Sequence, residues 1–250
     1  MDKRIQEILK ILKQNGHQAY LIGGSSLDEY LNLPYCDVDI TTDALPQQVC
    51  RLFFVVSEQG KMFGNVKIEF QGLKAEITTF RVEDYCYPSV YPKIVRFSQK
   101  AEEDSWRRDF TINALYMDEN KKITDFHQGL NDLQNRTIRL IGDPIKRLKE
   151  DPSRILRGLR LKQKLGFKMD ESTKRAFIQS VEEIKRLSIN KLAYEIKKTY
   201  EECGVEQTNQ LYEKERILTT LFGYNRVFFL NQSATISLEI IKEQLEEMID

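Results

Sequence analysis

The sequence predicts an α+β fold, with a mixed head up to about residue 135 and a helical remainder, and two observations support that division. Between residues 19 and 80, the apolar residues form short runs or alternate with polar ones, as is typical of strands. From Asp109 onward they recur mostly at helical spacing, apart from a short strand expected at Ile123–Asp125. We therefore expect a head domain over residues 1–135 and a helical unit over 136–250.

The first elements of the head follow from the spacing of apolar residues. Five of these residues recur at helical spacing and predict an opening helix that ends near Asn15: Ile5, Ile8, Leu9, Ile11 and Leu12. The period then changes, so that residues 19–22 are predicted to form a strand that runs into Gly23-Gly24. Residues 38–41 are predicted to form a second strand after a turn at Leu33-Pro34.

The rest of the chain supplies a hairpin, a loop and a terminal helix. Residues 66–70 and 75–80 alternate around Gln71-Gly72, which predicts a hairpin on the same sheet. Residues 85–92 contain two prolines and three tyrosines and are expected to form a loop. Apolar residues at helical spacing after Leu238 predict a last helix that packs on the preceding helices or on a second subunit.

Composition and charge narrow the class of protein. The hydrophobic content is 41%, no apolar run approaches the roughly 18 residues that a membrane helix needs, and the first residues lack a signal peptide pattern, so we expect a cytoplasmic protein. The 38 basic and 38 acidic residues cancel, but the block from Arg136 to Lys168 holds eleven Lys or Arg residues. That block is either a polyphosphate or RNA contact or a solvated helix face. The cysteines show no C-x-x-C spacing and predict neither a zinc site nor a disulfide framework: Cys36, Cys50, Cys86 and Cys203.

Two neighbouring segments indicate phosphate and metal chemistry. Gly23, Gly24 and Ser25 follow a predicted strand, where glycine backbone N–H groups and a serine hydroxyl can approach a phosphate. On the second predicted strand, Asp37 and Asp39 share one face, and two adjacent carboxylates are best accommodated by a divalent cation such as Mg²⁺. Metal ions held there would support in-line phosphoryl transfer. Glu76 on the hairpin is either a third carboxylate ligand or a solvent-facing residue.

A third segment, 107–115, is predicted to begin a helix. Asp109 is then its N-cap, and Asn113 lies four residues on, on the same side. Capping explains the aspartate but not the arginine pair before it. Arg108, Asp109 and Asn113 are therefore candidates for holding a triphosphate and a ribose hydroxyl.

A fourth segment, 150–160, combines a helix start with regularly spaced arginines. Asp151 is expected to cap a helix that begins at Pro152, and arginines follow at every third position along one face: Arg154, Arg157 and Arg160. A carboxylate only accepts hydrogen bonds, and a guanidinium only donates them. Side by side, the two groups match the pairing edges of cytosine and adenine and mismatch those of uracil and guanine. Asp151 with Arg154 is either such a base reader or an ordinary ion pair on a capped helix.

These segments, in this order, resemble the class II tRNA nucleotidyltransferases (CCA-adding enzymes) and the related bacterial poly(A) polymerases. The resemblance runs from about Tyr20 to Phe167 and is carried by LIGGSSLDEYLNLPYCDVDITTDALP, EITTFR, RRDFTINALYMD, GLNDLQNRTIRLIGDP and EDPSRILRGLRLKQKLGF. It implies a polymerase-β-like head in which Asp37 and Asp39 bind metal, Gly24 contacts nucleotide and Arg108 binds phosphate. It also implies that Asp151, Arg154, Arg157 and Arg160 read the nucleotide, with residues 136–250 as a neck and a shortened body.

The chain departs from the family pattern at two positions within the matched segments. Leu27 stands where the family usually has an arginine that contacts the nucleotide. The segment 85–92 lacks the usual basic residues of an element associated with the change from C to A addition. Both departures bear on nucleotide binding.

The expected reaction is addition of two CTP-derived and one ATP-derived nucleotides to the 3′ end of tRNA, with Mg²⁺ and release of pyrophosphate, by a monomer or homodimer. CC-adding, A-adding and poly(A) polymerase specificities are alternatives within the class. A degenerate paralogue that binds RNA without catalysis is a further alternative. A small-molecule nucleotidyltransferase would share the turn and the aspartate pair, but it would not need a reader for C and A.

Overall fold

The chain divides into two compact units in the computed structural model, which describes residues 1–35, 37–222 and 237–249. The first, which we call the head unit, comprises Met1–Asp84 and Lys93–Asn135. The second, the helical unit, comprises Arg136–Asp250 together with the segment Tyr85–Pro92. The sequence predicted that segment as a loop but gave no sign that it belongs with the helices.

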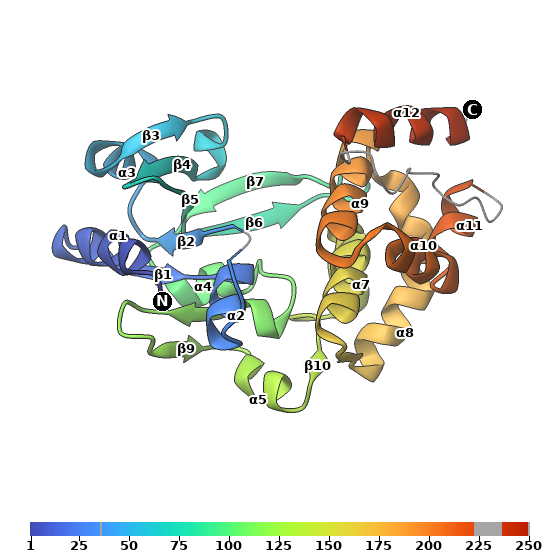
Figure 1. The fold of residues 1–250 in the computed structure, drawn as a ribbon, viewed down its shortest axis with the longest axis horizontal. Coiled ribbons are helices and arrows are strands. Elements are labelled where there is room, and N and C mark those ends of the chain that lie inside the picture. The colour runs from blue at the N-terminus through green and yellow to red at the C-terminus, as the bar shows by residue number, and fades with distance from the viewer. Residues whose placement is uncertain (36, 223–236, 250) are drawn as a thin grey trace. The chain divides into compact units, whose positions relative to one another are not determined.

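The head unit is built on one seven-stranded mixed sheet (Figure 1). In spatial order its strands are β3 (Phe54–Ser57), β4 (Asn65–Phe70), β5 (Leu73–Thr79), β2 (Asp39–Thr42), β1 (Ala19–Leu21), β8 (Leu115–Met117) and β9 (Ile123–Asp125). The β2–β5 pair is parallel and the other pairs are antiparallel. Gln71 and Gly72, both with positive φ, close the predicted β4–β5 hairpin, which is confirmed.

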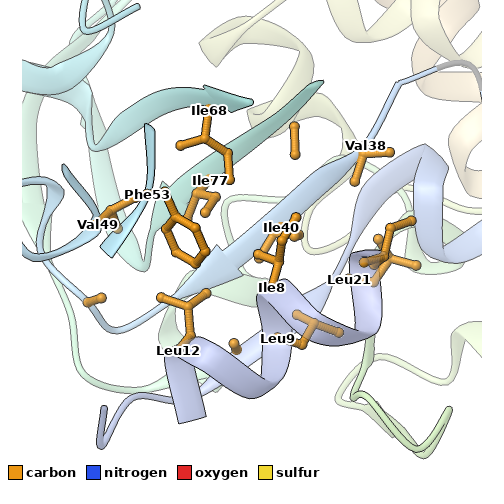
Figure 2. Packing of buried hydrophobic residues seen from close by; sticks show 14 of the residues in the cluster. Ile8, Leu9, Leu12, Leu21, Val38, Ile40, Val49, Phe53, Ile68 and Ile77 are labelled. Atoms are coloured by element: carbon orange, nitrogen blue, oxygen red, sulfur yellow. The ribbon is translucent and has the colours of Figure 1, made fainter. Parts of the chain in front are cut away.

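One face of this sheet carries the main core of the head unit (Figure 2). Helix α1 (Lys3–Gln14), where the sequence predicted a helix, turns Ile8 and Leu12 toward the sheet, and Ile40 and Ile77 point back at them. Strand side chains alternate between the two faces, so the neighbours of these core isoleucines, Asp39 and Glu76, lie on the opposite face. The packing that stabilises the head therefore also places carboxylates on its polar face.

Smaller elements surround the sheet. They are helices α2 (Gly23–Tyr30), α3 (Pro46–Leu52), α4 (Ala101–Ser105) and α5 (Gly129–Gln134), 3₁₀ turns η1 (Lys61–Phe63) and η2 (Thr111–Asn113), and the paired strands β6 (Arg81–Tyr85) and β7 (Pro92–Phe97). The sequence did not predict β6, β7 or β8. All three residues of β8 are buried, so the alternation that identifies a strand is absent there.

The helical unit contains seven α-helices within the described ranges. They are α6 (Pro144–Glu150), α7 (Ser153–Leu165), α8 (Glu171–Ser180), α9 (Ile189–Cys203), α10 (Val205–Lys214), α11 (Ile217–Phe222) and α12 (Leu238–Ile249), with a 3₁₀ turn η3 (Val181–Arg186) and a short parallel pair, β10 (Thr137–Ile138) and β11 (Lys168–Met169). Helix α9 packs against both α7 and α12. The predicted terminal helix is confirmed, and its residues Ile241 and Leu245 are fully buried.

Two further expectations concern membrane spans and cysteines. Within the described part of the chain, each helix is too short or too polar to cross a bilayer. Cys50, Cys86 and Cys203 are free thiols, and Cys36 lies outside the described residues. The α+β class, with a mixed-sheet head and helices after it, is confirmed.

Candidate functional site

The predicted glycine turn forms the start of helix α2, directly after β1. Gly23 has φ +69°, and a Cβ placed on it would come within 3.3 Å of Asp39 Oδ2. The backbone N–H of Ile22 also donates to the carbonyl oxygen of Asp39 at 3.0 Å. Glycine is required at position 23 both for its backbone conformation and for the close approach of the Asp39 carboxylate.

Ser25 fixes the aspartate segment against α2. Its buried hydroxyl donates to the carbonyl oxygen of Asp37 at 2.9 Å and accepts from the backbone N–H of Asp39 at 2.8 Å. The hydroxyl was predicted to contact a phosphate, and in this structure its proton is used on Asp37 instead. The phosphate contact of Ser25 stays a prediction, whereas its role in positioning the two aspartates is a structural fact.

The two aspartates do not both lie on a strand. Strand β2 begins at Asp39, one residue later than predicted, and Asp37 occupies a bend before it. The strand does not extend back to Asp37, because β5 pairs with β2 only from the Asp39–Glu76 register position onward. Asp37 is exposed and Asp39 is half-buried.

Glu76 lies beside Asp39 on the neighbouring strand, in register with it. Its carboxylate accepts from Asn65 Nδ2 at 2.9 Å and lies 3.9 Å from Lys67 Nζ. Glu76 is thus next to the aspartate pair, but its oxygens contact side chains of β4.

The aspartate pair suits a magnesium ion. Over residues 1–35, 37–222 and 237–249, no group of three or more His, Cys, Asp or Glu side chains is arranged to hold a metal by itself. Mg²⁺ in phosphoryl-transfer sites is commonly bound by one or two carboxylates, with waters and substrate phosphates as the other ligands. Hard carboxylate oxygens beside a Gly23 backbone that leaves room at Asp39 Oδ2 fit that kind of site.

The arginine pair of the third segment is anchored on a buried aspartate that the sequence analysis missed. Asp104 accepts from Arg107 Nε at 2.7 Å, from Arg108 Nη2 at 2.7 Å and from the Tyr116 hydroxyl at 2.7 Å. Burial raises the pKa of Asp104, but the guanidinium groups of Arg107 and Arg108 outweigh it and hold that pKa below its usual range. Arg108 is therefore held at a defined position as a permanent cation.

The helix predicted to begin at Asp109 does not form. The chain makes only the single 3₁₀ turn η2, whose N-cap is Phe110, so the capping role predicted for Asp109 is wrong. A helix cannot continue past Asn113, because Leu115 to Met117 form the buried strand β8 and pair with β1. Asn113 ends the turn, and its Oδ1 is buried without a hydrogen-bond partner among the described residues. This buried oxygen can accept a hydrogen bond from a hydroxyl group of a ligand.

In the helical unit, the Asp151 carboxylate lies at the junction of α6 and α7. Asp151 Oδ1 accepts from the backbone N–H of Ser153 at 3.0 Å, from its hydroxyl at 2.7 Å and from Lys191 Nζ at 2.9 Å. Oδ2 accepts from Arg157 Nη2 at 3.0 Å. Helix α7 begins at Ser153, one residue later than predicted, with Pro152 at the cap position.

Arg154 is one of the largest side chains that the fold buries completely, with 1% exposure. Its Nη1 donates to the carbonyl oxygen of Arg147 at 2.5 Å and lies 3.7 Å from the Glu150 carboxylate. The Tyr85 ring centroid is 5.7 Å from its guanidinium carbon. A buried guanidinium fixed in this way has a defined orientation.

The three arginines of α7 do not share one set of partners. Arg160 Nη1 donates to Glu195 Oε2 of α9 at 2.8 Å, and Arg157 Nη1 lies 3.7 Å from the other oxygen of Glu195. Arg154 instead contacts α6. Positions six apart on a helix differ by about 120°, so the prediction of a common face is wrong for Arg154 and Arg160.

Most of the basic block between Arg136 and Lys168 is paired within the helical unit. Lys162 lies 2.6 Å from Glu215, and Lys164 and Arg160 both contact Glu202. Exposed lysines of the block are Lys146, Lys149 and Lys168. Three carboxylates that come later in the chain, Glu195, Glu202 and Glu215, thus offset part of the local excess of positive charge seen in the sequence.

Sequence reasoning missed Asp104, Lys191 and Glu195. Asp104 precedes Arg108 by four residues, a spacing typical of ion pairs on helices, and that signal was available. Lys191 and Glu195 are also four apart, but their partners lie 40 and 35 residues earlier in the chain. Only the packing of α9 on α7 brings those groups together.

Known proteins resemble the chain over most of its length. Residues 19–139 match the family described as "Poly A polymerase head domain". A protein named CCA-adding enzyme from Staphylococcus epidermidis is 37% identical over 211 residues, which cover 84% of this chain and 53% of that protein. One of the same name from Lactobacillus helveticus is 40% identical over 191 residues, covering 76% of this chain and 48% of that protein.

A solved structure gives the same result for the fold. The crystal structure of the Bacillus stearothermophilus CCA-adding enzyme in complex with CTP superposes with a TM-score of 0.78 at 32% identity, over 88% of this chain and 54% of that one. The chain thus spans about half the length of the relatives that it matches.

Proposed function

Since the chain belongs to the family of class II tRNA nucleotidyltransferases (CCA-adding enzymes) and bacterial poly(A) polymerases, we propose that it adds CCA to the 3′ end of tRNA. CTP is used twice and ATP once, and each addition releases pyrophosphate. The observation that best supports this proposal is the arrangement of Asp37 and Asp39, which Ser25 ties to the glycine start of α2.

Asp37 and Asp39 hold Mg²⁺ in this proposal. When bound by these two carboxylates, Mg²⁺ supplies positive charge that favours ionisation of the RNA 3′-hydroxyl and offsets the charge of the departing pyrophosphate. Ser25 keeps the two aspartates at a fixed separation from α2, because its hydroxyl bonds to the backbone of both. The site is therefore organised before substrate arrives.

The remaining head residues bind the nucleotide. Backbone N–H groups at Gly23 and Gly24 open the helix α2 and suit a phosphate oxygen. Arg108, kept cationic by Asp104, offsets the triphosphate charge. Asp109 follows Arg108 in the chain and belongs to the same set. Asn113 Oδ1 accepts a hydrogen bond from a ribose hydroxyl.

Nucleotide selection falls on the helical unit. Asp151 presents an acceptor and Arg154 a donor, the combination that matches cytosine and adenine. Arg157 and Arg160 complete this reading set, and Glu195 holds both of them in place.

The test is incubation of the chain with tRNA that lacks its CCA end, Mg²⁺ and each nucleotide separately and in mixture, followed by sequencing of the RNA products. CCA addition from the mixture and C addition from CTP alone are expected. Addition of C only, of A only or of long A tracts would identify the corresponding specificity within the family. No extension of any RNA, with RNA binding retained, would support a non-catalytic paralogue and refute the proposal.

A further inference from the structure

Lys191 of α9 contacts the proposed base-reading carboxylate of Asp151 and lies outside the segment 150–160 that contains it. Its Nζ lies 2.9 Å from Asp151 Oδ1, although the two residues are 40 positions apart in the chain. The lysine side chain is 20% exposed and the aspartate side chain 8%, so the pair is largely shielded from water. The Tyr91 ring centroid lies 5.3 Å from the same ammonium group. This lysine has no place in the reading set that the sequence predicted.

The contacts at Asp151 differ between its two oxygens. Oδ1 accepts three hydrogen bonds, two from Ser153 and one from Lys191. Oδ2 accepts one hydrogen bond among the described residues, from Arg157. A carboxylate oxygen accepts about two hydrogen bonds readily, so Oδ2 is the oxygen with capacity for the amino group of a base.

The charge state of Asp151 decides which bases it can match. As a carboxylate it only accepts, which suits the amino groups of cytosine and adenine. As a neutral acid it can also donate, and it then suits the carbonyl oxygens of uracil and guanine. Burial raises the pKa of Asp151, and Arg157, Lys191 and Arg154 lower it further than burial raises it. Loss of one of these cations therefore moves the group toward the form that reads the wrong bases.

We propose that Lys191 is a positioning residue for nucleotide selection: it occupies Oδ1 and keeps Asp151 an ionised acceptor whose Oδ2 is left for the base. This inference rests on the proposed function, since it concerns the same reading site. Lys191 itself does not touch the nucleotide in this scheme and acts only through Asp151.

Other charged groups on the elements packed around Asp151 also affect its ionisation. Those on the packed elements are Arg147 and Glu150 of α6, Arg154 and Arg157 of α7, and Glu195 of α9. The carboxylates in this set oppose ionisation of Asp151, and the guanidinium groups favour it. All of them stay in place when only Lys191 is changed.

The experiment compares Lys191→Met and Lys191→Arg with a matched control. Lys197→Met removes a lysine from the same helix, where it pairs with the exposed carboxylate of Glu201 instead. The preference for CTP over UTP is measured for each variant in two ways: by nucleotide addition to tRNA lacking its CCA end, and by equilibrium binding of CTP and UTP. Both measurements are made between pH 5.5 and 8, and circular dichroism checks the fold.

For Lys191→Met, the preference for CTP should fall about tenfold at neutral pH, the effect of losing one charge-assisted contact. This loss should grow as the pH is lowered, because removal of the Lys191 charge raises the pKa of Asp151. Lys191→Arg should restore the wild-type preference, since it returns the charge, and Lys197→Met should keep it. Wild-type preference should not depend on pH over this range.

Two outcomes separate the inference from the proposed function. If the wild type extends tRNA and Lys191→Met, correctly folded, keeps its preference for CTP at every pH, the role of Lys191 is refuted and the function stands. If the wild type binds CTP over UTP without extending RNA, the transfer reaction is refuted. The binding preference of Lys191→Met then still decides the role of the lysine.

Discussion

The candidate site residues of the head unit and those of the helical unit are held in place by different kinds of contact. In the head unit, Asp39 is positioned by backbone hydrogen bonds, by the register of β2 with β5 and by the absence of a side chain at Gly23. In the helical unit, Asp151 is positioned by ion pairs with Arg157 and Lys191. Backbone contacts thus fix Asp39 beside the start of α2, whereas side-chain pairing gives Asp151 a fixed charge.

This difference predicts different consequences of mutation. A carboxylate held through its backbone can lose its side chain with little effect on folding, because the hydrogen bonds that position it remain. A carboxylate that neutralises buried cations cannot, because its removal leaves those cations without a counter-charge. Activity and stability should therefore separate in the head unit and fall together in the helical unit.

The largest expected effect is on catalysis in the head unit. Asp37→Ala or Asp39→Ala should lower nucleotide addition ~10³-fold or more, because either change weakens the proposed metal site. The thermal unfolding midpoint should change little, since the Ser25 hydrogen bonds use only backbone atoms of both residues. Steady addition rates with Mg²⁺ and thermal unfolding are the measurements. Near wild-type rates in either variant would exclude the metal assignment.

The next effect is on stability and selection together in the helical unit. Asp151→Asn should lower the free energy of unfolding by about 3 kcal/mol, because Lys191 and Arg157 lose their shared anion. It should also raise UTP incorporation relative to CTP, because an amide can donate where the carboxylate only accepts. Chemical denaturation and competitive incorporation measure the two effects. A variant with wild-type stability and unchanged preference for CTP would show that the ion pairs of Asp151 contribute to neither property.

The pH dependence of the stability difference between wild type and Asp151→Asn provides a further test. The pKa of Asp151 in the folded chain lies below its unfolded value, which is about 3.9 for aspartate. Its stabilising contribution is therefore fully present above about pH 4 and is lost as the pH falls through the folded-state pKa. The stability gap between wild type and Asp151→Asn should shrink only below about pH 4. A gap that closes between pH 7 and 5 would contradict the depressed pKa.

The same contrast explains which features the sequence could predict. The glycine turn, the aspartates and the β4–β5 hairpin depend on residues close together in the chain, and the pattern of residues 23–39 and 66–79 specifies them. The helix expected at Asp109 failed because burial of β8 in the sheet overrides a local capping signal. The ion pairs of Asp151 with Lys191 and of Arg160 with Glu195 depend on α9, and spacing along α7 contains no information about them.

A moderate effect is expected from the hydroxyl that ties the head site together. Ser25→Ala removes the partner of the Asp39 N–H and of the Asp37 carbonyl, and should cost about 1–3 kcal/mol of stability and about tenfold in addition rate. Ser26→Ala is the matched control, because among the described residues its hydroxyl donates only to the carbonyl oxygen of Gly23, in the same helix. Equal rates for the two variants would show that the aspartates need no such support.

The smallest effect concerns RNA affinity and the basic block. Lys149 is exposed at the end of α6, whereas Lys162 is paired with Glu215 at 2.6 Å. Lys149→Ala should weaken tRNA binding about two- to threefold and lower the slope of log affinity against log salt by about one, because one phosphate contact is lost. Lys162→Ala should leave that slope unchanged, since its charge is already used within the protein. Filter binding between 50 and 200 mM salt measures both slopes. Equal slopes would mean that pairing inside the helical unit does not decide which cations meet the RNA.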